Sequence, residues 1–514
     1  MAFLIFARAG FVRIVRPISD FYVAGRLMPA TFNGLAIAVS SIAALVFVGA
    51  AGAVGPNWEG VASLLIGGGL GLILSGVLLA PYLRMYGGYT LPDFLAERFG
   101  GDKVRPLAVL AVILCSFPAL AVVLLAFGLL TAAVFPLPVA SGVGAGVALI
   151  FVATLIGGMR SLSLSQIAYY TVLFAASLAA VVVVLWQTGT LFDTELLLLD
   201  DVVPSLGLDF FAQSDTANRL GLVVCLAAGT ASFPYLLMRS FTTPSAGEAR
   251  ASFLAAPVFA GLLCLAAPAF AALYEAAWTK AGDVLAMIAE AVLFVGAMAG
   301  LLAAGGALAL SIGNVLSYDI YYKSVHPTAS TRRQLFVARL SVIVVTGLAG
   351  LAAVAGPHEM LTAASAAFSL AASAFLPVLV LGVWWKRANS EAALAGMIAG
   401  LVACLYYMIA PHTMPFVFYE SSSFLSNATE AQTAAYEALR HDYYLVDATA
   451  KQAVLADWDQ AVRPIANWWG VRGAFAGLFA VPIGFVVIVG VSLFTRAPSD
   501  DVLRFVKGLR ARAA

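Results

Sequence analysis

Long runs of apolar residues follow one another along this chain, separated by shorter polar connections. Each run holds about 20 or more mostly apolar residues, the length that an α-helix needs to cross the hydrocarbon core of a bilayer. The runs cover residues 33–55, 60–83, 105–135, 139–157, 165–187, 219–241, 251–275, 284–322, 333–355, 359–385, 391–411 and 468–495. Because the apolar residues are continuous rather than alternating, the pattern predicts about twelve transmembrane helices and argues against a transmembrane β-barrel. The eighth run is too long for a perpendicular span, so it should tilt or extend past the membrane.

Composition supports an integral membrane protein. Of the 514 residues, 62% are hydrophobic and only 11% are charged, whereas about 25% are charged in ordinary soluble domains. The net charge of +1 gives no electrostatic reason for a nucleic-acid partner. The four cysteines all lie in apolar runs and read as buried small hydrophobic residues. No phosphate-binding loop and no histidine-rich metal set is found, so we expect no enzyme activity and no cofactor.

Lysine and arginine residues gather in every second connection, which predicts the orientation of the chain. The intervening connections carry few basic residues or are acidic on balance, as are 188–218 and 412–467. The N-terminal segment and the tail are both basic. We therefore expect both termini in the cytoplasm, with the protein in the cell (inner or plasma) membrane. The basic residues of the connections predicted to be cytoplasmic are Arg84, Arg98, Lys103, Arg105, Arg160, Arg239, Arg250, Lys323, Arg332, Arg333, Lys386 and Arg387.

The count of spans fits two five-helix repeats in opposite orientation, a common plan of secondary transporters. The predicted organisation begins with a short N-terminal segment, 1–32, that holds a reduced or truncated first helix. The first repeat (33–187), an extracytoplasmic loop (188–218) and the inverted second repeat (219–385) follow. Residues 386–495 add two helices with the long outer loop 412–467, which has a partly helical, amphipathic pattern, and 496–514 form a basic tail.

Two spans in corresponding positions of the repeats carry residues that interrupt helices. The sixth holds GTASFP, in which Pro234 lacks an amide hydrogen and clashes with the carbonyl four residues back. The first holds Ser40 and Ser41, followed by GAAGAVG. Freed backbone groups in a membrane need a cavity, water or an ion, so we expect both helices to break at a binding site. The alternative for the sixth span is a proline kink whose hydroxyls bond back to their own helix.

Few charges lie inside the spans. Asp319 lies at the cytoplasmic end of the eighth span, beside Tyr318 and Tyr321. Arg239 ends the sixth span, where snorkelling toward water and a favourable helix C-terminus explain it. We therefore expect no relay of charges across the membrane.

Six stretches in the same order resemble the solute:sodium symporter family, most closely its acetate-permease-like, monocarboxylate branch. They are DFYVAGR (Asp20–Arg26), YTLPDFLAERFG (Tyr89–Gly100), IGGMRSLSLSQ (Ile156–Gln166), GTASFPYLLMRSFTTPSAGEAR (Gly229–Arg250), SIGNVLSYDIYY (Ser311–Tyr322) and AAFSLAASAFLPVLVLGVWWKR (Ala366–Arg387). The resemblance implies a fold of the leucine-transporter type, with all-α architecture and two inverted repeats. Family members usually carry one further helix before the first stretch. This chain lacks a full one, so we expect its first helix to be truncated or reduced.

The resemblance also implies a sodium site, and this chain departs from it. In sodium-coupled members the ion is held by backbone carbonyls of the first core helix and by two adjacent hydroxyls of the eighth, in keeping with the oxygen ligands that hard cations prefer. Aligned on SIGNVLSYD, the hydroxyl pair falls on Ala303 and Ala304, whose methyl groups cannot coordinate an ion. The carbonyls of the first helix fall on Val39 and Ile42.

The carboxylates common near this site are also replaced. The aspartate of the first helix gives way to Ser40 or Ser41, and that of the fifth to Gln166, next to Ser165. Three explanations stay open. In the first, coupling uses protons or a displaced sodium site. In the second, hydroxyls rebuild a weaker sodium site. In the third, coupling is lost, and the protein is a uniporter or a sensor that acts with a partner, such as a small membrane subunit. The hydroxyls concerned are those of Ser40, Ser41, Ser165 and Ser311.

A small organic anion is the substrate class that this lining favours. Exposed amides and the positive ends of half-helices can hold a monocarboxylate such as acetate, so no arginine is needed, and none is found at mid-depth in the spans. A sugar would need several polar partners that the apolar lining does not offer. The function predicted is cation-coupled symport by alternating access, with Na⁺ or H⁺ as coupling ion. Candidate substrate-binding or gating residues are Ser40, Ser41, Phe47, Thr230, Ser232 and Tyr235.

Overall fold

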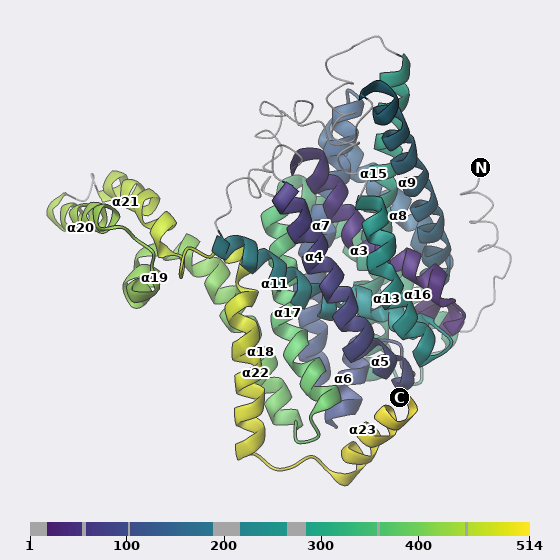
Figure 1. The fold of residues 1–514 in the computed structure, drawn as a ribbon. Helices are drawn as coiled ribbons and strands as arrows, with labels where there is room; N and C mark the ends of the chain where they lie inside the picture. The colour runs from purple at the N-terminus through teal and green to yellow at the C-terminus, as the bar shows by residue number, and fades with distance from the viewer. Residues whose placement is uncertain are drawn as a thin grey trace.

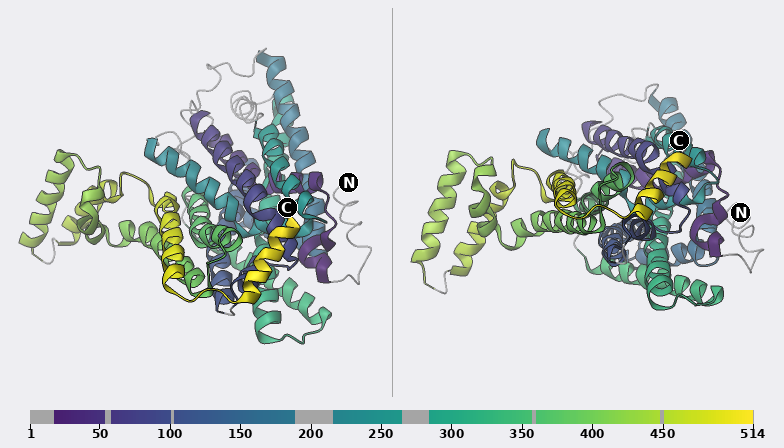
Figure 2. Two further views of the ribbon diagram at one scale, coloured as in Figure 1. Left: turned by 60° about the horizontal axis from the view of Figure 1, so that its bottom comes forward. Right: turned by 90° about the horizontal axis from the view of Figure 1, so that it is seen from below.

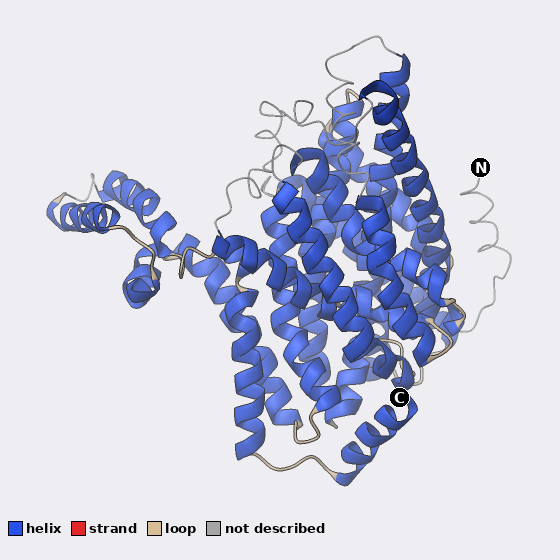
Figure 3. Cartoon of the chain, in the orientation of Figure 1, coloured by secondary structure: helices blue, strands red, loops and turns tan. Residues whose placement is uncertain are grey.

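The structure, a computed structural model, describes residues 18–53, 58–100, 103–188, 216–264, 284–356, 360–447 and 451–513. Over these segments the chain is helical and contains no extended strand (Figure 3). The predicted N-terminal stump within residues 1–17 and most of the predicted loop 188–218 (residues 189–215) lie outside the described residues. A tight bundle of long helices fills the centre of the molecule (Figure 1).

A helix occupies each of the twelve apolar runs over the described residues. They are α3 (Ala30–Ala53), α4 (Trp58–Leu74), α7 (Val104–Val134), α8 (Val139–Thr154), α9 (Gly158–Thr188), α11 (Thr216–Ser232), α13 (Ala246–Cys264), α15 (Val284–Asn314), α16 (Thr331–Ala355), α17 (Met360–Trp384), α18 (Ser390–Thr413) and α22 (Gly477–Phe494). Within the described segments, eight helices are long and apolar enough to cross a membrane, or nine if one bent pair counts as a span.

Two of these helices continue with a wider, π-helical winding. After α4 the chain passes through η2 (Ser75–Leu79) into α5 (Ala80–Tyr86), and α15 continues through η6 (Val315–Val325). The eighth run therefore extends well past one membrane thickness, as its length predicted. π-Turns often occur at functional sites because they change which side chains face a neighbouring helix.

The packing of the first ten helices repeats when each helix is exchanged for the one five positions later. α3 packs on α13 as α11 packs on α4, which are the first–seventh and sixth–second pairs. Likewise α7 packs on α17 as α15 packs on α9, the third–tenth and eighth–fifth pairs. Each half therefore makes equivalent contacts with the other, which is the packing expected of two inverted five-helix repeats. The helices α18 and α22 pack together against the outside of α17.

Three short helices between α18 and α22 form an arm that projects sideways from the bundle (Figures 1 and 2). They are α19 (Pro415–Ser422), α20 (Glu430–Leu445) and α21 (Lys451–Ala466), so the helical pattern predicted for 412–467 is confirmed. Aromatic residues form the core of the arm, with the rings of Phe416 and Trp458 3.8 Å apart. A capping box between Thr429 and Gln432 starts α20.

Three short helices cover the lower end of the bundle in Figure 1. They are α2 (Ile18–Val23), α6 (Leu91–Phe99) and α23 (Asp500–Ala513). Arg98 of α6 is fully buried, and its guanidinium donates to the carbonyls of Gly382, Trp385 and Ala388 at the end of α17. Burial lowers the pKa of Arg98 to about 10, so the group stays charged at neutral pH. A cation at a helix C-terminus stabilises the exposed carbonyls there.

Close packing of α8 on α7 depends on glycine. A Cβ atom on Gly142 would lie 2.8 Å from the Cβ of Thr131 and 2.9 Å from the backbone of Gly128, whereas a Cβ on Gly144 would meet nothing within 4 Å. We expect Gly142→Ala to push the helices apart and lower stability by about 1–3 kcal/mol. Gly144→Ala, on the same helix, should leave stability unchanged or slightly raised. Thermal unfolding of the two purified variants makes the comparison, and equal melting temperatures would contradict it.

Candidate substrate and ion site

The sixth span is broken in the middle of the bundle. α11 ends at Ser232, Phe233 is extended with φ −66° and ψ 123°, and α12 (Pro234–Leu237) and η5 (Met238–Thr242) continue the span after a bend of 43°. Pro234 has no amide hydrogen, and Phe233 accepts from the amide of Leu237 at 3.0 Å to start the next helix. The predicted break of the sixth span is therefore present, and it is buried.

Side chains from neighbouring helices partner the carbonyls near the break. Ser75, at the start of the π-turn after α4, donates to the carbonyl of Ala231 at 3.0 Å. Ser232 donates to Ala228 of its own helix at 2.7 Å and to Ala371 of α17 at 3.2 Å. The hydroxyl of Ser232 thus bonds back to its own helix, as the alternative of a plain kink predicted, and also ties the break to the tenth span.

The expected break of the first span is not seen. α3 is one unbroken helix from Ala30 to Ala53. The reason lies in its serines, because Ser40 donates back to Ala36 at 2.7 Å and Ser41 to Ala38 at 3.3 Å, and neither removes a backbone hydrogen bond as a proline does. Gly55 of the predicted break lies outside the described residues.

Of the six candidate substrate residues, the structure brings two together. The hydroxyl of Tyr235, just after the break, donates to the carbonyl of Ser40 at 3.1 Å. The broken part of the sixth span therefore meets the serine pair of the first span here. Thr230 packs against α4, where a Cβ on Gly71 would lie 2.6 Å from its Cβ. Ser232 faces α17 and Ser41 its own helix, and Phe47 belongs to the part of α3 whose side chains are not described.

The predicted ion residues lie on three helices that meet beside this contact. Gln166 of α9 is buried, and its amide donates to the carbonyl of Ala303 on α15 at 2.7 Å. Ala303 and Ala304 are buried, as is Val39 on α3, and Ser165 is half-buried. Ser311 is buried and its hydroxyl has no hydrogen-bond partner within the described structure. Ile42 lies on α3, in the stretch without described side chains.

The expectation that Arg239 snorkels toward water is wrong. Its side chain is 0% exposed and reaches back into the bundle toward α9. The guanidinium donates from Nη1 to the hydroxyl of Ser163 at 2.7 Å and from Nη2 to the side-chain oxygen of Gln166. Arg239 therefore lies beside Gln166, one of the predicted ion residues, although the sequence placed no arginine at mid-depth. An ionisable residue inside a span is a functional candidate by default, which is the signal that could have found it.

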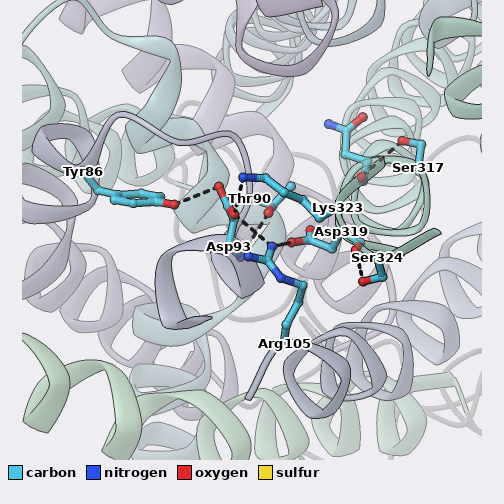
Figure 4. A network of polar contacts seen from close by, with 9 residues as sticks. Tyr86, Thr90, Asp93, Arg105, Ser317, Asp319, Lys323 and Ser324 are labelled. Atoms are coloured by element: carbon cyan, nitrogen blue, oxygen red, sulfur yellow. Dashed lines mark hydrogen bonds and ion pairs between the residues drawn. The ribbon is translucent and has the colours of Figure 1, made fainter. Parts of the chain in front are cut away.

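A network of charges closes the end of the bundle that the arginine pattern predicts to be cytoplasmic (Figure 4). Arg105, at the start of α7, bridges two carboxylates, with Nη1 2.9 Å from Asp93 of α6 and 2.7 Å from Asp319 of η6. Lys323 approaches Asp93 at 3.5 Å, and the hydroxyl of Tyr86 donates to Asp93 at 2.8 Å. Both carboxylates are nearly fully buried. Sequence analysis singled out Asp319 but missed its partners, which lie more than 200 residues away.

Aromatic rings pack beside this network. Tyr22 of α2 stacks on Tyr89 at 5.6 Å and packs against Tyr318 of η6 at the same distance. The hydroxyls of Tyr22 and Ser317 lie 2.9 Å apart and share a hydrogen bond. Burial raises the pKa of Tyr22 to about 12, so the hydroxyl stays protonated. Charges and rings together connect α2, α6, α7 and η6.

The inverted packing, the bent sixth span and the buried polar residues beside it describe a helical membrane transporter. A model of the sodium:solute symporter family matches residues 21–400. The chain therefore belongs to the sodium:solute symporter family, and its fold is of the leucine-transporter type.

Named relatives agree with this assignment. The chain is 29% identical to an uncharacterised symporter of Cupriavidus necator, over 98% of this chain and 92% of that protein. It is 30% identical to an uncharacterised symporter of Bacillus subtilis, over 75% of this chain and 80% of that one. It is 27% identical to a monocarboxylic acid transporter of Corynebacterium glutamicum, over 75% and 78%.

A solved structure is similar in fold. It is the outward-open, substrate-bound state of a Na⁺-coupled sialic acid symporter, with a TM-score of 0.69. The alignment covers 97% of each chain at 14% sequence identity. This likeness supports the fold of the whole chain, from the first described helix to the last.

Removing Arg105 should damage the charge network severely. Arg105→Gln leaves two buried carboxylates without their shared cation, and breaking a buried pair in this way costs about 3–5 kcal/mol. Adding Asp319→Asn should restore part of the lost stability by removing one of those carboxylates. Arg504→Gln is the control, because its pair with Asp501 is exposed and contributes about 0–1 kcal/mol. Thermal unfolding of the purified variants measures all three, and equal losses for Arg105→Gln and Arg504→Gln would contradict the account.

Proposed function

We propose that this protein is a secondary active transporter that carries a small monocarboxylate, such as acetate, by alternating access. The observation that carries the proposal is the buried break of the sixth span, which places the start of α12 beside the first span at the Tyr235–Ser40 contact. The helical stretch 234–242 presents the positive end of its dipole at the break, which favours a carboxylate nearby. The Corynebacterium relative named as a monocarboxylic acid transporter supports the same substrate class.

The apolar surroundings of the break favour a small substrate. Phe233 is fully buried and packs against Phe368 of α17, with ring centroids 5.1 Å apart. The hydroxyls next to this point, those of Ser75 and Ser232, already donate to backbone carbonyls, so a sugar would lose many hydrogen bonds with water and gain few in return. A short carboxylic acid needs partners at one end only, and its alkyl part fits an apolar lining.

The coupling ion is the second part of the proposal. The family makes sodium a plausible partner, yet the positions aligned with its hydroxyl ligands are Ala303 and Ala304, and the Ala303 carbonyl already accepts from Gln166. We propose that the sodium site of this chain is degenerate and that cation coupling uses a proton or a weaker sodium site.

Alternating access requires the charge network to open on one side. Arg105 holds α6, α7 and η6 together through Asp93 and Asp319. We propose that this end faces the cytoplasm and that the network acts as the inner gate. When the ion pairs part, water enters and solvates each charged group. The network can therefore exchange its ion-pair partners for water.

Uptake into proteoliposomes tests the substrate and the coupling together. Radiolabelled acetate, propionate and pyruvate are supplied with an inward sodium gradient or an inward proton gradient, each imposed separately, and empty liposomes give the passive background. We expect saturable uptake of at least one acid that rises several-fold with one of the gradients. Uptake of none of the acids would refute the substrate class. Saturable uptake that ignores both gradients would refute symport and indicate facilitated diffusion.

The Tyr235–Ser40 contact should matter for transport more than for stability. Tyr235→Phe removes one buried hydrogen bond, worth about 0.5–1.5 kcal/mol. Tyr407→Phe removes two hydrogen bonds outside the ten-helix core, because this buried tyrosine of α18 donates to the carbonyl of Val471 and accepts from the amide of Trp468. We expect a lower melting temperature in both variants, with a loss at least as large in Tyr407→Phe, but a raised KM for uptake only in Tyr235→Phe. An unchanged KM in Tyr235→Phe would remove this residue from the substrate path.

A further inference from the structure

We propose that Arg239 is an anion-binding residue, and that the carboxylate of the substrate pairs with its guanidinium on the way between the break and the charge network. This inference rests on the proposed function, since it assigns that substrate a contact. It begins from the burial of a positive charge. The Arg239 side chain is 0% exposed, and no carboxylate of the described segments forms an ion pair with it.

The partners of the guanidinium are neutral and leave part of it unused. Nη1 donates to Ser163 and Nη2 to Gln166, while Nε has no hydrogen-bond partner. An arginine cannot shed its charge as lysine or histidine can. A buried charge without a counter-charge is strongly unfavourable. A carboxylate that binds Nε and a free N–H of a terminal nitrogen would supply both the missing charge and the missing hydrogen bonds.

The surroundings hold the guanidinium in one place, as a binding site requires. Ser163 and Gln166 are three residues apart on one face of α9. The backbone carbonyl of Arg239 accepts from the side chain of Asn33 on α3 at 3.2 Å, and Thr242 donates to the same Asn33 side chain at 3.1 Å. Arg239 is therefore fixed at its backbone by α3 and at its tip by α9.

The position of Arg239 lies on the route that the proposed function requires. Arg239 follows Tyr235 by four residues in the same helical stretch, so the two side chains fall on the same side of it, one turn apart. Tyr235 contacts the first span, and Arg239 lies one turn closer to the end closed by the charge network. The neighbouring Ser240 is also buried, and its hydroxyl has no partner in the described structure.

The same charge explains the weak sodium site. Gln166 bonds both Arg239 and the carbonyl of Ala303, so the guanidinium lies one side chain away from the aligned ion residues. A fixed positive charge at that distance repels a cation in a low-dielectric interior. Gln166 is neutral, and an aspartate at this position, which the family resemblance leads one to expect, would cancel the charge internally. Its replacement leaves the charge available to an anion.

Competition by an internal carboxylate gives the sharpest test. Gln166→Glu keeps the length of the side chain and places a carboxylate against Arg239, which should pair with the guanidinium and exclude the substrate anion. Uptake of radiolabelled propionate into proteoliposomes should then show a KM at least tenfold higher, with the melting temperature unchanged or raised. Gln166→Met removes both hydrogen bonds of this side chain without adding charge, so it should lower stability and raise KM by clearly less than Gln166→Glu does.

A second variant addresses Arg239 itself. Arg239→Lys keeps the charge but loses the planar fork, so we expect a KM at least fivefold higher. Arg98→Lys is the matched control, because Arg98 is equally buried but donates to three carbonyls at the end of α17. It should reduce the yield of folded protein and leave KM unchanged.

The outcomes separate the two proposals. A wild-type protein that takes up none of the carboxylates refutes the proposed function. Saturable wild-type uptake whose KM is unchanged in Gln166→Glu and in Arg239→Lys overturns the anion site alone. An equal rise of KM in Gln166→Met and Gln166→Glu also overturns it, because the effect would then come from lost hydrogen bonds and not from charge.

Discussion

The structure depends on one constraint, that the backbone groups freed by the break of the sixth span must find partners inside the protein. The break of the sixth span disturbs the hydrogen bonding of the backbone between two half-helices, and neighbouring helices compensate for it. Ser75 of the second span donates to Ala231, and Ser232 donates to Ala371 of the tenth. The π-turn that begins at Ser75 and the contact of Tyr235 with Ser40 follow from the same requirement. The centre of the bundle is therefore held together by the partners of one interrupted helix.

The bundle accommodates buried positive charge in two different ways. At the closed end Arg105 pairs with Asp93 and Asp319, so opposite charges satisfy each other. Deeper in the bundle Arg239 has only neutral partners. The first arrangement is suited to a gate, because ion pairs can exchange for water when the helices part. The second is suited to a ligand of opposite charge. The contrast between these two arginines is the reason for proposing different roles for them.

Much of the fold could be predicted from the sequence because a bilayer imposes a simple pattern. Each of the twelve apolar runs coincides with helix where the chain is described, and Pro234 marked the break of the sixth span. The first span was wrongly expected to break, since serine hydroxyls resemble a disruption in sequence but bond to their own helix in the structure. The partners of Arg239 and Asp319 could not be predicted, because they come from helices 70 or more residues away and depend on rotation of each helix about its axis. Hydropathy does not report that rotation.

The position of the bound acid tests the account most directly. A short carboxylic acid is hard to recognise in electron density because it is small. A structure of the protein with 3-bromopropionate would place the ligand unambiguously, since its bromine is located by anomalous scattering. The account predicts a carboxylate within hydrogen-bond distance of the Arg239 guanidinium or beside the start of α12, with the bromine in the apolar lining beside Phe233. A ligand bound away from the broken sixth span, with Arg239 still lacking an anion, would contradict it.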